Sequence, residues 1–179
     1  TKEYAPLYRF VRDHAVLLDD YDTWVDLAIV LPHRSFLKNP DPWFELCGKL
    51  SARQISYRLL LAGDEIVDHP LTAAELDGSA PLLITQRDEL LPDDEQLLAQ
   101  VLPGRCVFDT VEEALAQVRP AVQANTAGTL RVLPRVRPGS AVVHLLNFDY
   151  DPLRDGVRPL NDVQLTLNLD ALGVPDVRE

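Results

Sequence analysis

The sequence predicts an α/β fold in which helices cover both faces of a parallel sheet, followed by a few antiparallel strands. Two observations support this prediction. Over residues 26–118, short apolar runs alternate with longer helical stretches, as they do when helices connect parallel strands. Beyond residue 128, apolar and polar residues alternate, which is typical of half-buried antiparallel strands.

The first part of the chain supplies four strands and the helices that connect them. The predicted strands are short and apolar, at residues 26–31, 65–68, 81–85 and 106–108. The predicted helices have apolar residues at helical spacing or a proline and acids in the first turn, at residues 4–18, 43–62, 91–102 and 111–118, with one further turn at 71–76. Gly63 is expected to cap the helix at 43–62. A flavodoxin-like three-layer arrangement with strand order 2-1-3-4 follows from this alternation.

The second part begins after a polar stretch at residues 123–128, which reads as a linker. Strands at 130–136 and 141–148 flank a Pro-Gly turn and should form a hairpin. Residues 163–169 alternate strictly and indicate a third strand. We therefore predict a flavodoxin-like domain at 1–122 and antiparallel strands of a partial β-sandwich at 129–170. So few strands expose edges, so we expect them to contact the first domain or to self-associate.

The composition excludes several classes of partner. The chain has 179 residues, 46% of them hydrophobic, and a formal net charge of −11 with a pI of about 4.7. An acidic surface repels nucleic-acid backbones and anionic lipid, so we expect neither nucleic acid nor a membrane as a partner. The sequence contains no methionine, so we expect a piece of a longer protein.

Most catalytic signatures are missing from the sequence. No glycine-rich phosphate loop follows a strand, neither cysteine lies in a nucleophile elbow, and the four histidines lack zinc spacing. We therefore predict no catalytic residue, no metal and no cofactor. The polar loop at 147–156 has oxygen ligands at alternate positions, as calcium loops do, but it lacks the glutamate of such loops, so we expect a turn built from Asx side chains.

One candidate ligand site remains, at the carboxyl ends of the predicted strands, where ligands of open α/β sheets bind. The polar residues there that we select are His33, Arg34, Gln86 and Arg87. The alternative is that these are solvated loop residues and helix caps. His33 alone is not a catalytic group without an acid or base partner.

Three stretches resemble a known arrangement: residues 8–14 (YRFVRDH), residues 71–83 with 91–101, and residues 142–151 (VVHLLNFDYD) before the last strand. Together they resemble the region that follows the catalytic barrel in certain bacterial glycoside hydrolases. There, as in the family 42 β-galactosidases, a glutamine-amidotransferase-like domain of flavodoxin type follows the barrel and a β-sandwich comes last. The resemblance implies that the catalytic carboxylates lie in a barrel that this chain lacks. It carries over no amidotransferase residue, because the cysteine elbow is missing.

The sequence thus favours a non-catalytic accessory or oligomer-forming region of a carbohydrate-active enzyme. Its partners would be the rest of a parent enzyme or a neighbouring subunit, with carbohydrate as a candidate ligand. One alternative is an independent small-molecule or sugar-binding α/β module. Another is a degenerate hydrolase or transferase with a site at His33 and Arg87. For the chain by itself we expect no glycosidase, amidase or esterase turnover.

Overall fold

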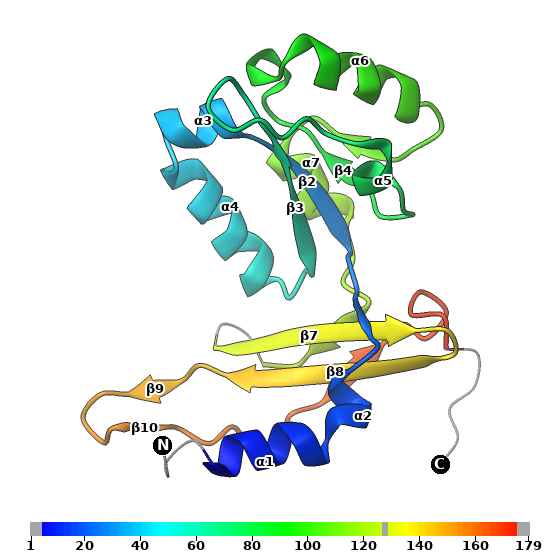
Figure 1. The fold of residues 1–179 in the computed structure, drawn as a ribbon. Coiled ribbons are helices and arrows are strands. Elements are labelled where there is room, and N and C mark those ends of the chain that lie inside the picture. The colour runs from blue at the N-terminus through cyan, green and yellow to red at the C-terminus, as the bar shows by residue number, and fades with distance from the viewer. Residues whose placement is uncertain (1–4, 127–128, 175–179) are drawn as a thin grey trace.

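The structure, a computed structural model, describes residues 5–126 and 129–174. It consists of an α/β unit and an antiparallel unit, joined where the chain passes between them (Figure 1). Within the described residues, no helix is long and apolar enough to cross a membrane.

The α/β unit is built on a four-stranded parallel sheet with strand order β3-β2-β4-β5. The strands are β2 (Leu27–Pro32), β3 (Tyr57–Ala62), β4 (Leu82–Leu83) and β5 (Val107–Phe108). This confirms the predicted parallel sheet and its order, since the second strand in the chain lies outside the first and the third and fourth follow on the other side.

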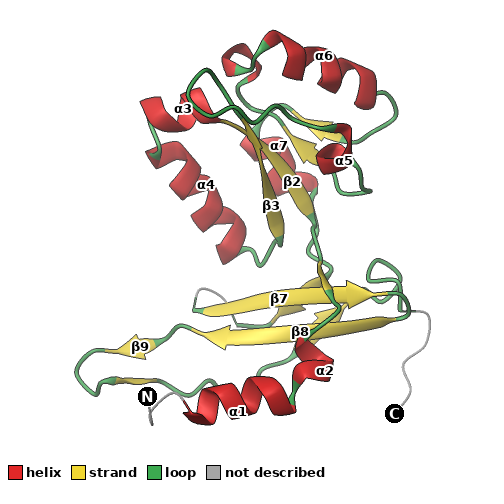
Figure 2. Ribbon diagram, in the orientation of Figure 1, coloured by secondary structure: helices red, strands yellow, loops and turns green. Residues whose placement is uncertain are grey.

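Helices cover both faces of this sheet, which makes the predicted three-layer fold (Figure 2). Every residue of β2 is buried, and successive side chains point to opposite faces. One face packs on α4 (Asp41–Ala52) and α7 (Val111–Gln117), and the other on α5 (Ala73–Leu76) and α6 (Pro92–Val101). Leu50 of α4 and Leu98 of α6 are fully buried, and each such side chain contributes about 1.5–3 kcal/mol.

The helix starts follow their sequence signals. Thr110 caps α7, its hydroxyl accepting a hydrogen bond from the amide of Glu113 at 3.2 Å. Thr72 and Glu75 form a reciprocal capping box on α5. Helix α6 begins at Pro92 and has three acidic residues in its first turn, where the positive end of the helix dipole favours them.

The predicted helix at 43–62 is confirmed only as far as Ala52, and the predicted strand at 65–68 is wrong. Helix α4 ends at Ala52, and the chain reverses through Gln54, which has a φ of 60°. The apolar run that follows forms β3, and the residues predicted as a strand form a loop. Gly63 therefore follows a strand and caps no helix. Alternating and helical spacing are hard to separate in so short an apolar run.

The antiparallel unit contains the predicted hairpin. Strands β7 (Leu130–Arg137) and β8 (Ser140–Asn147) pair along their whole length around a turn at Pro138 and Gly139. Gly139 has a φ of 73°, which only glycine adopts at little cost. A further small hairpin, β9 (Tyr150–Asp151) with β10 (Gly156–Val157), extends from this sheet (Figure 1).

The remaining strands pair differently from the prediction. Residues 122–124, most of which belong to the predicted linker, form β6 (Val122–Ala124), which pairs with β11 (Leu165–Leu167). Strand β11 is the predicted third strand, although shorter, and it does not join the hairpin. Apolar residues from both sheets form a core that includes Val122, Leu130 and Val132.

The N-terminal segment belongs to this antiparallel unit. The predicted helix at 4–18 is divided at His14 into α1 (Ala5–Asp13) and α2 (Ala15–Leu18), which lie beside the β7–β8 hairpin (Figure 1). The next segment, β1 (Asp22–Thr23), pairs with β7. The α/β unit is thus inserted between β1 and β6.

One buried carboxylate lies where the chain passes between the units. Asp26 accepts hydrogen bonds from the Trp24 indole at 2.7 Å, the Ala121 amide at 2.9 Å and the Ser56 amide at 2.8 Å. Burial raises the pKa of Asp26, although these three donors oppose the shift. The carboxylate joins the entering strand, the exiting strand and the start of β3 at one point.

Candidate functional site

The carboxyl ends of the parallel strands bring the candidate residues to one edge of the sheet. Helix α3 (His33–Lys38) begins directly after β2, and a 3₁₀ turn, η1 (Arg87–Glu89), follows β4. The four candidates form two groups. His33 and Arg34 contact the loop after β3, whereas Gln86 contacts α3 and Arg87 contacts the end of β5. No hydrogen bond or ion pair joins the two groups in the described part of the chain.

His33 is paired with a buried carboxylate. Its Nδ1 lies 2.8 Å from Oδ2 of Asp64, whose side chain is only 2% exposed. The other oxygen of Asp64 accepts the amides of Ile66 at 2.8 Å and Val67 at 2.9 Å. The Val67 amide, and then His33, lower the pKa of Asp64, so the carboxylate stays charged and orients the imidazole.

The loop that carries Asp64 is tightly closed. The Gly63 amide donates to the His69 carbonyl at 2.8 Å. A Cβ on Gly63 would lie 2.2 Å from the Val67 carbonyl oxygen and 2.8 Å from backbone atoms of His69. Glycine is therefore required at this position for steric reasons, and the loop places Asp64 beneath His33.

The two candidate arginines are in ion pairs. The Arg34 guanidinium binds both carboxylate oxygens of Glu65, with Nε at 3.2 Å. The Arg87 guanidinium lies 3.4 Å from Asp109 after β5. Neither arginine presents an uncommitted charge for an anionic ligand, because each carboxylate would compete with it.

Gln86 takes part in a hydrogen-bonded chain with Ser35. The Ser35 hydroxyl donates to Oε1 of the Gln86 side chain and accepts from the Trp43 indole at 3.2 Å. Ser35 therefore lacks the neighbouring base that would activate it as a nucleophile. A cleft of about 280 Å³ opens beside this chain of bonds, lined also by Lys38, Glu89 and three further residues: Asn39, Pro42 and Asp88.

The polar loop at 147–156 is built from Asx turns. Asn147 accepts the amide of Asp149 at 2.9 Å, and Asp151 accepts the amide of Leu153 at 3.0 Å. Arg158 lies 3.4 Å from both Asp149 and Asp151. The described residues include no cluster of His, Cys, Asp and Glu suited to a metal ion.

Sequence reasoning missed two groups at the strand ends. It placed residues 43–62 in a helix, so the end of β3 and hence Asp64 were not considered. The pair Gly63-Asp64 after an apolar run was the available signal. It also missed Lys38 and Glu89, whose Nζ and Oε1 atoms lie 2.6 Å apart at the rim of the cleft. That pairing depends on the neighbouring positions of α3 and η1.

No protein-family model, curated protein sequence or solved structure matches this chain.

Proposed function

We propose that this chain is a non-catalytic assembly region, which packs through its antiparallel unit on another polypeptide. The observation that carries the proposal is the distribution of exposed apolar side chains. Most of the large ones lie in the antiparallel unit, on α1, α2, the hairpin and the β9–β10 extension. Phe10 of α1 is 55% exposed and Leu153 of the extension is 96% exposed. Gathered apolar surface of this kind marks an interaction site.

The state of the strand-end groups supports a non-catalytic role. His33, Arg34 and Arg87 each have a carboxylate partner within the chain. Ser35 and Gln86 bind each other. Paired in this way, the groups fix the loops at the sheet edge, and among the described residues Ser35 makes no hydrogen bond to a base.

The parent protein is part of the proposal. We infer a carbohydrate-active enzyme, with the rest of that enzyme or a neighbouring subunit as the surface that is bound. The sequence resemblance alone supports this inference, and residues 142–151, which form most of β8 and the start of the extension, carry its most specific part.

The proposal is tested on the full chain by sedimentation velocity over a range of concentrations, together with the fluorescence of an apolar dye. Phe10→Ser should reduce both association and dye binding. Phe44→Ser is the matched control, because Phe44 is 65% exposed on a helix of the other unit. A monomer at every concentration that binds no dye, or turnover of a chromogenic glycoside that is lost in His33→Ala, refutes the proposal.

A second candidate function is a sugar-binding α/β module. It is favoured by the position of the 280 Å³ cleft between the ends of β2 and β4, whose connections leave the sheet in opposite directions. Hydroxyl, amide, amine and carboxylate groups line the cleft, and such groups bind sugar hydroxyls. Titration calorimetry with a panel of monosaccharides tests it. Heat of binding that is abolished by Gln86→Ala supports this function, and no heat from any sugar refutes it.

A further inference from the structure

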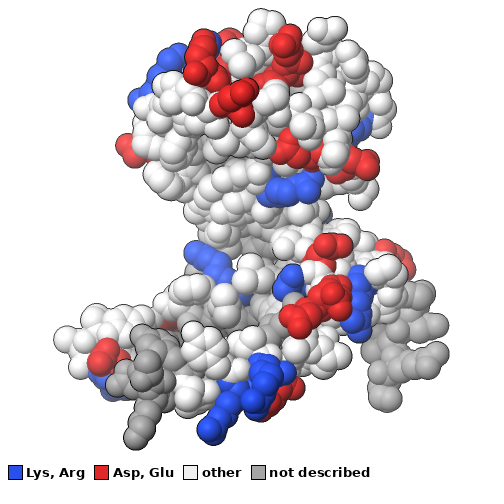
Figure 3. Space-filling model, viewed as in Figure 1, with Lys and Arg blue, Asp and Glu red and all other residues white. Residues whose placement is uncertain are grey.

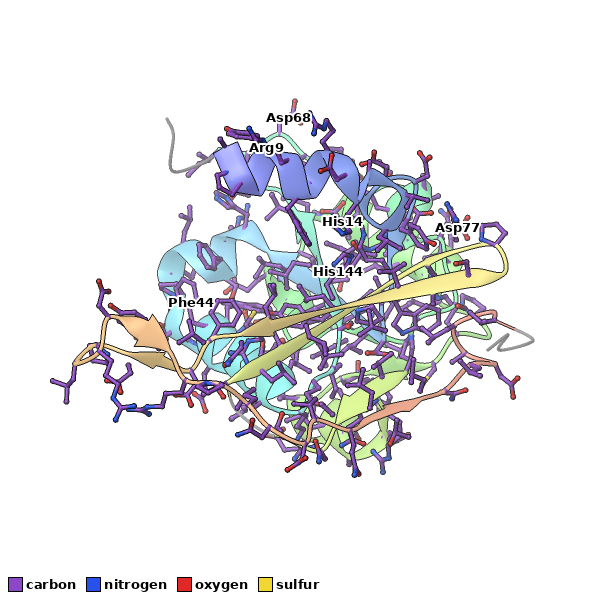
Figure 4. All side chains as sticks on the ribbon, turned by 90° about the horizontal axis from the view of Figure 1, so that it is seen from below. Arg9, His14, Phe44, Asp68, Asp77 and His144 are labelled. Carbon is purple, nitrogen blue, oxygen red and sulfur yellow. The ribbon has the colours of Figure 1, made fainter. Side chains whose placement is uncertain are left out.

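Strand β8 forms one edge of its sheet. In the described part of the chain it pairs with β7 alone, while β7 also pairs with β1 on its other side. Figure 4, viewed from below, shows the strands of this hairpin with α1 to one side. The edge is eight residues long.

The hydrogen bonds of β7 show which backbone groups of β8 point outward. The Trp24 amide donates to the Pro134 carbonyl at 3.0 Å, so the even-numbered residues of β7 face β1. Its odd-numbered residues therefore face β8, where their partners are even-numbered, as in the pair Leu133 and His144. The amides and carbonyls of the odd-numbered residues Ala141, Val143, Leu145 and Asn147 consequently point away from β7, and the described residues supply them with no backbone hydrogen-bond partner.

This edge lacks the usual protection against pairing. Exposed edge strands are commonly blocked by charged residues, proline or a bulge. The sequence of β8, SAVVHLLN, contains no charged residue and no proline, and its pairing with β7 is regular. Leu145 and Leu146 are 41% and 45% exposed, so both sides of the edge are apolar.

We propose that β8 pairs antiparallel with β8 of a second copy of this chain, which joins the two sheets across a two-fold axis. This inference rests on the proposed function and names its partner. Only residues whose amide and carbonyl point outward can form hydrogen bonds to the second copy. The register in which all of these residues are paired places Val143 opposite Leu145 of the second copy, and the two-fold axis repeats this pair. His144 then lies opposite the second copy's His144 in a non-hydrogen-bonded pair.

The distribution of charge favours a second copy as the occupant. Residues 24–121 contain sixteen Asp and Glu against eight Lys and Arg, whereas residues 5–23 and 129–174 of the antiparallel unit together contain nine Asp and Glu against seven Lys and Arg. Acidic side chains accordingly predominate on the α/β unit in Figure 3, and both signs occur on the antiparallel unit. Contact through β8 brings together the weakly charged parts of two acidic chains and keeps their strongly acidic α/β units apart.

Disulfide trapping tests the register directly. The full chain is prepared with Cys47→Ser and Cys106→Ser, which remove the native thiols, and then with His144→Cys or Leu133→Cys. Residues in a non-hydrogen-bonded pair have Cα atoms about 4.5 Å apart, so His144→Cys should form a disulfide-linked dimer under mild oxidation. Leu133→Cys lies one strand further from the axis, about 14 Å from its counterpart, and should remain a monomer.

Association is measured in parallel by sedimentation velocity. Val143→Pro removes an outward amide without touching the bonds to β7, and the loss of two such bonds per dimer should raise the dissociation constant about 30-fold. Leu145→Lys places a charge on the edge and should act in the same direction. Leu133→Lys is its matched control, because Leu133 is 44% exposed on the inner strand. Circular dichroism verifies that each variant is folded.

The outcomes separate this inference from the proposed function. Dimers that are trapped through position 144 alone and weakened by the two edge variants support edge pairing. Association that persists in both edge variants, with no trapping at 144, overturns edge pairing but leaves the assembly function standing. A strict monomer overturns edge pairing, and dye binding that Phe10→Ser lowers would then still support docking on a different polypeptide.

Discussion

Replacing Asp26 with alanine should destabilise the whole chain, because this carboxylate joins three segments. The substitution removes the acceptors of the Trp24 indole, the Ser56 amide and the Ala121 amide. The hydrogen bond from the Ala121 amide is buried, and those from the Trp24 indole and the Ser56 amide are partly buried. In the described residues no other side chain accepts from the amides of Ser56 and Ala121, so alanine at position 26 leaves both amides unpaired.

The magnitude follows from the environment of each donor. A buried donor left without a partner costs about 1–3 kcal/mol, and each partly buried hydrogen bond contributes about 0.5–1.5 kcal/mol. The sum, about 2–6 kcal/mol, is reduced because alanine also removes the cost of burying a charge, which is what raises the pKa of Asp26. We expect Asp26→Ala to lower the free energy of unfolding by about 3 kcal/mol.

Urea unfolding of the full chain at neutral pH, followed by circular dichroism, measures this change. The matched control is Asp22→Ala, which removes an exposed carboxylate from β1 and should change the free energy of unfolding by less than about 0.5 kcal/mol. If Asp26→Ala were no more destabilising than Asp22→Ala, the three hydrogen bonds would not hold the units together and the reasoning would be refuted.

Three further predictions concern the same two regions. Gly63→Ala should lower the free energy of unfolding by about 2 kcal/mol or more, measured by urea, because its Cβ meets backbone atoms at 2.2 Å. Asp64→Asn should lower the free energy of unfolding at neutral pH by about 1 kcal/mol, because a neutral amide replaces the charged partner of His33 Nδ1; an unchanged free energy of unfolding would contradict the pairing. The native carboxyl groups should also differ in pH dependence. The pKa of Asp64 is lowered, so its charged form stabilises the chain above pH 3.8, the ordinary pKa of an aspartate. This stabilisation is lost as the pH falls through the pKa of Asp64 in the folded chain. The pKa of Asp26 is raised, so the stabilisation by its protonated form is complete below pH 3.8. This stabilisation declines as the pH rises through the pKa of Asp26 in the folded chain. Unfolding of Asp64→Asn and Asp26→Ala at several pH values should therefore show differences from the native chain with opposite slopes.

The order of the parallel sheet was predictable because its strongest strands are apolar on both faces. Leu27–Pro32 can only be a central strand, and helices of sufficient length connect it to its neighbours. The boundary between α4 and β3 was not predictable in the same way. Residues 57–62 fit both periodicities, and the deciding event, the left-handed conformation of Gln54, occurs in a residue with no strong turn preference.

The candidate site was predictable in its location and not in its contacts. Parallel strands place their carboxyl ends together, so His33 and Gln86 could be assigned to one edge from sequence. Their partners, Asp64 and Ser35, depend on loop geometry. Strand β6 was missed for a related reason, since its polar surroundings indicate a linker and its pairing with β11 is made some forty residues away.

The insertion of the α/β unit between β1 and β6 has a consequence for synthesis on the ribosome. The Tyr21 carbonyl binds the Arg135 side chain across a sequence separation of 114 residues, and β1 pairs with β7 over a similar interval. Helix α1, with its exposed apolar residues, must therefore wait while the entire inserted unit is translated and folds. Contacts between residues that are far apart in the sequence make folding slow. Apolar segments that stay exposed in the meantime are prone to aggregate or to bind chaperones. The nascent N-terminal segment is thus the part of this chain most dependent on protection before the sheet that receives it exists.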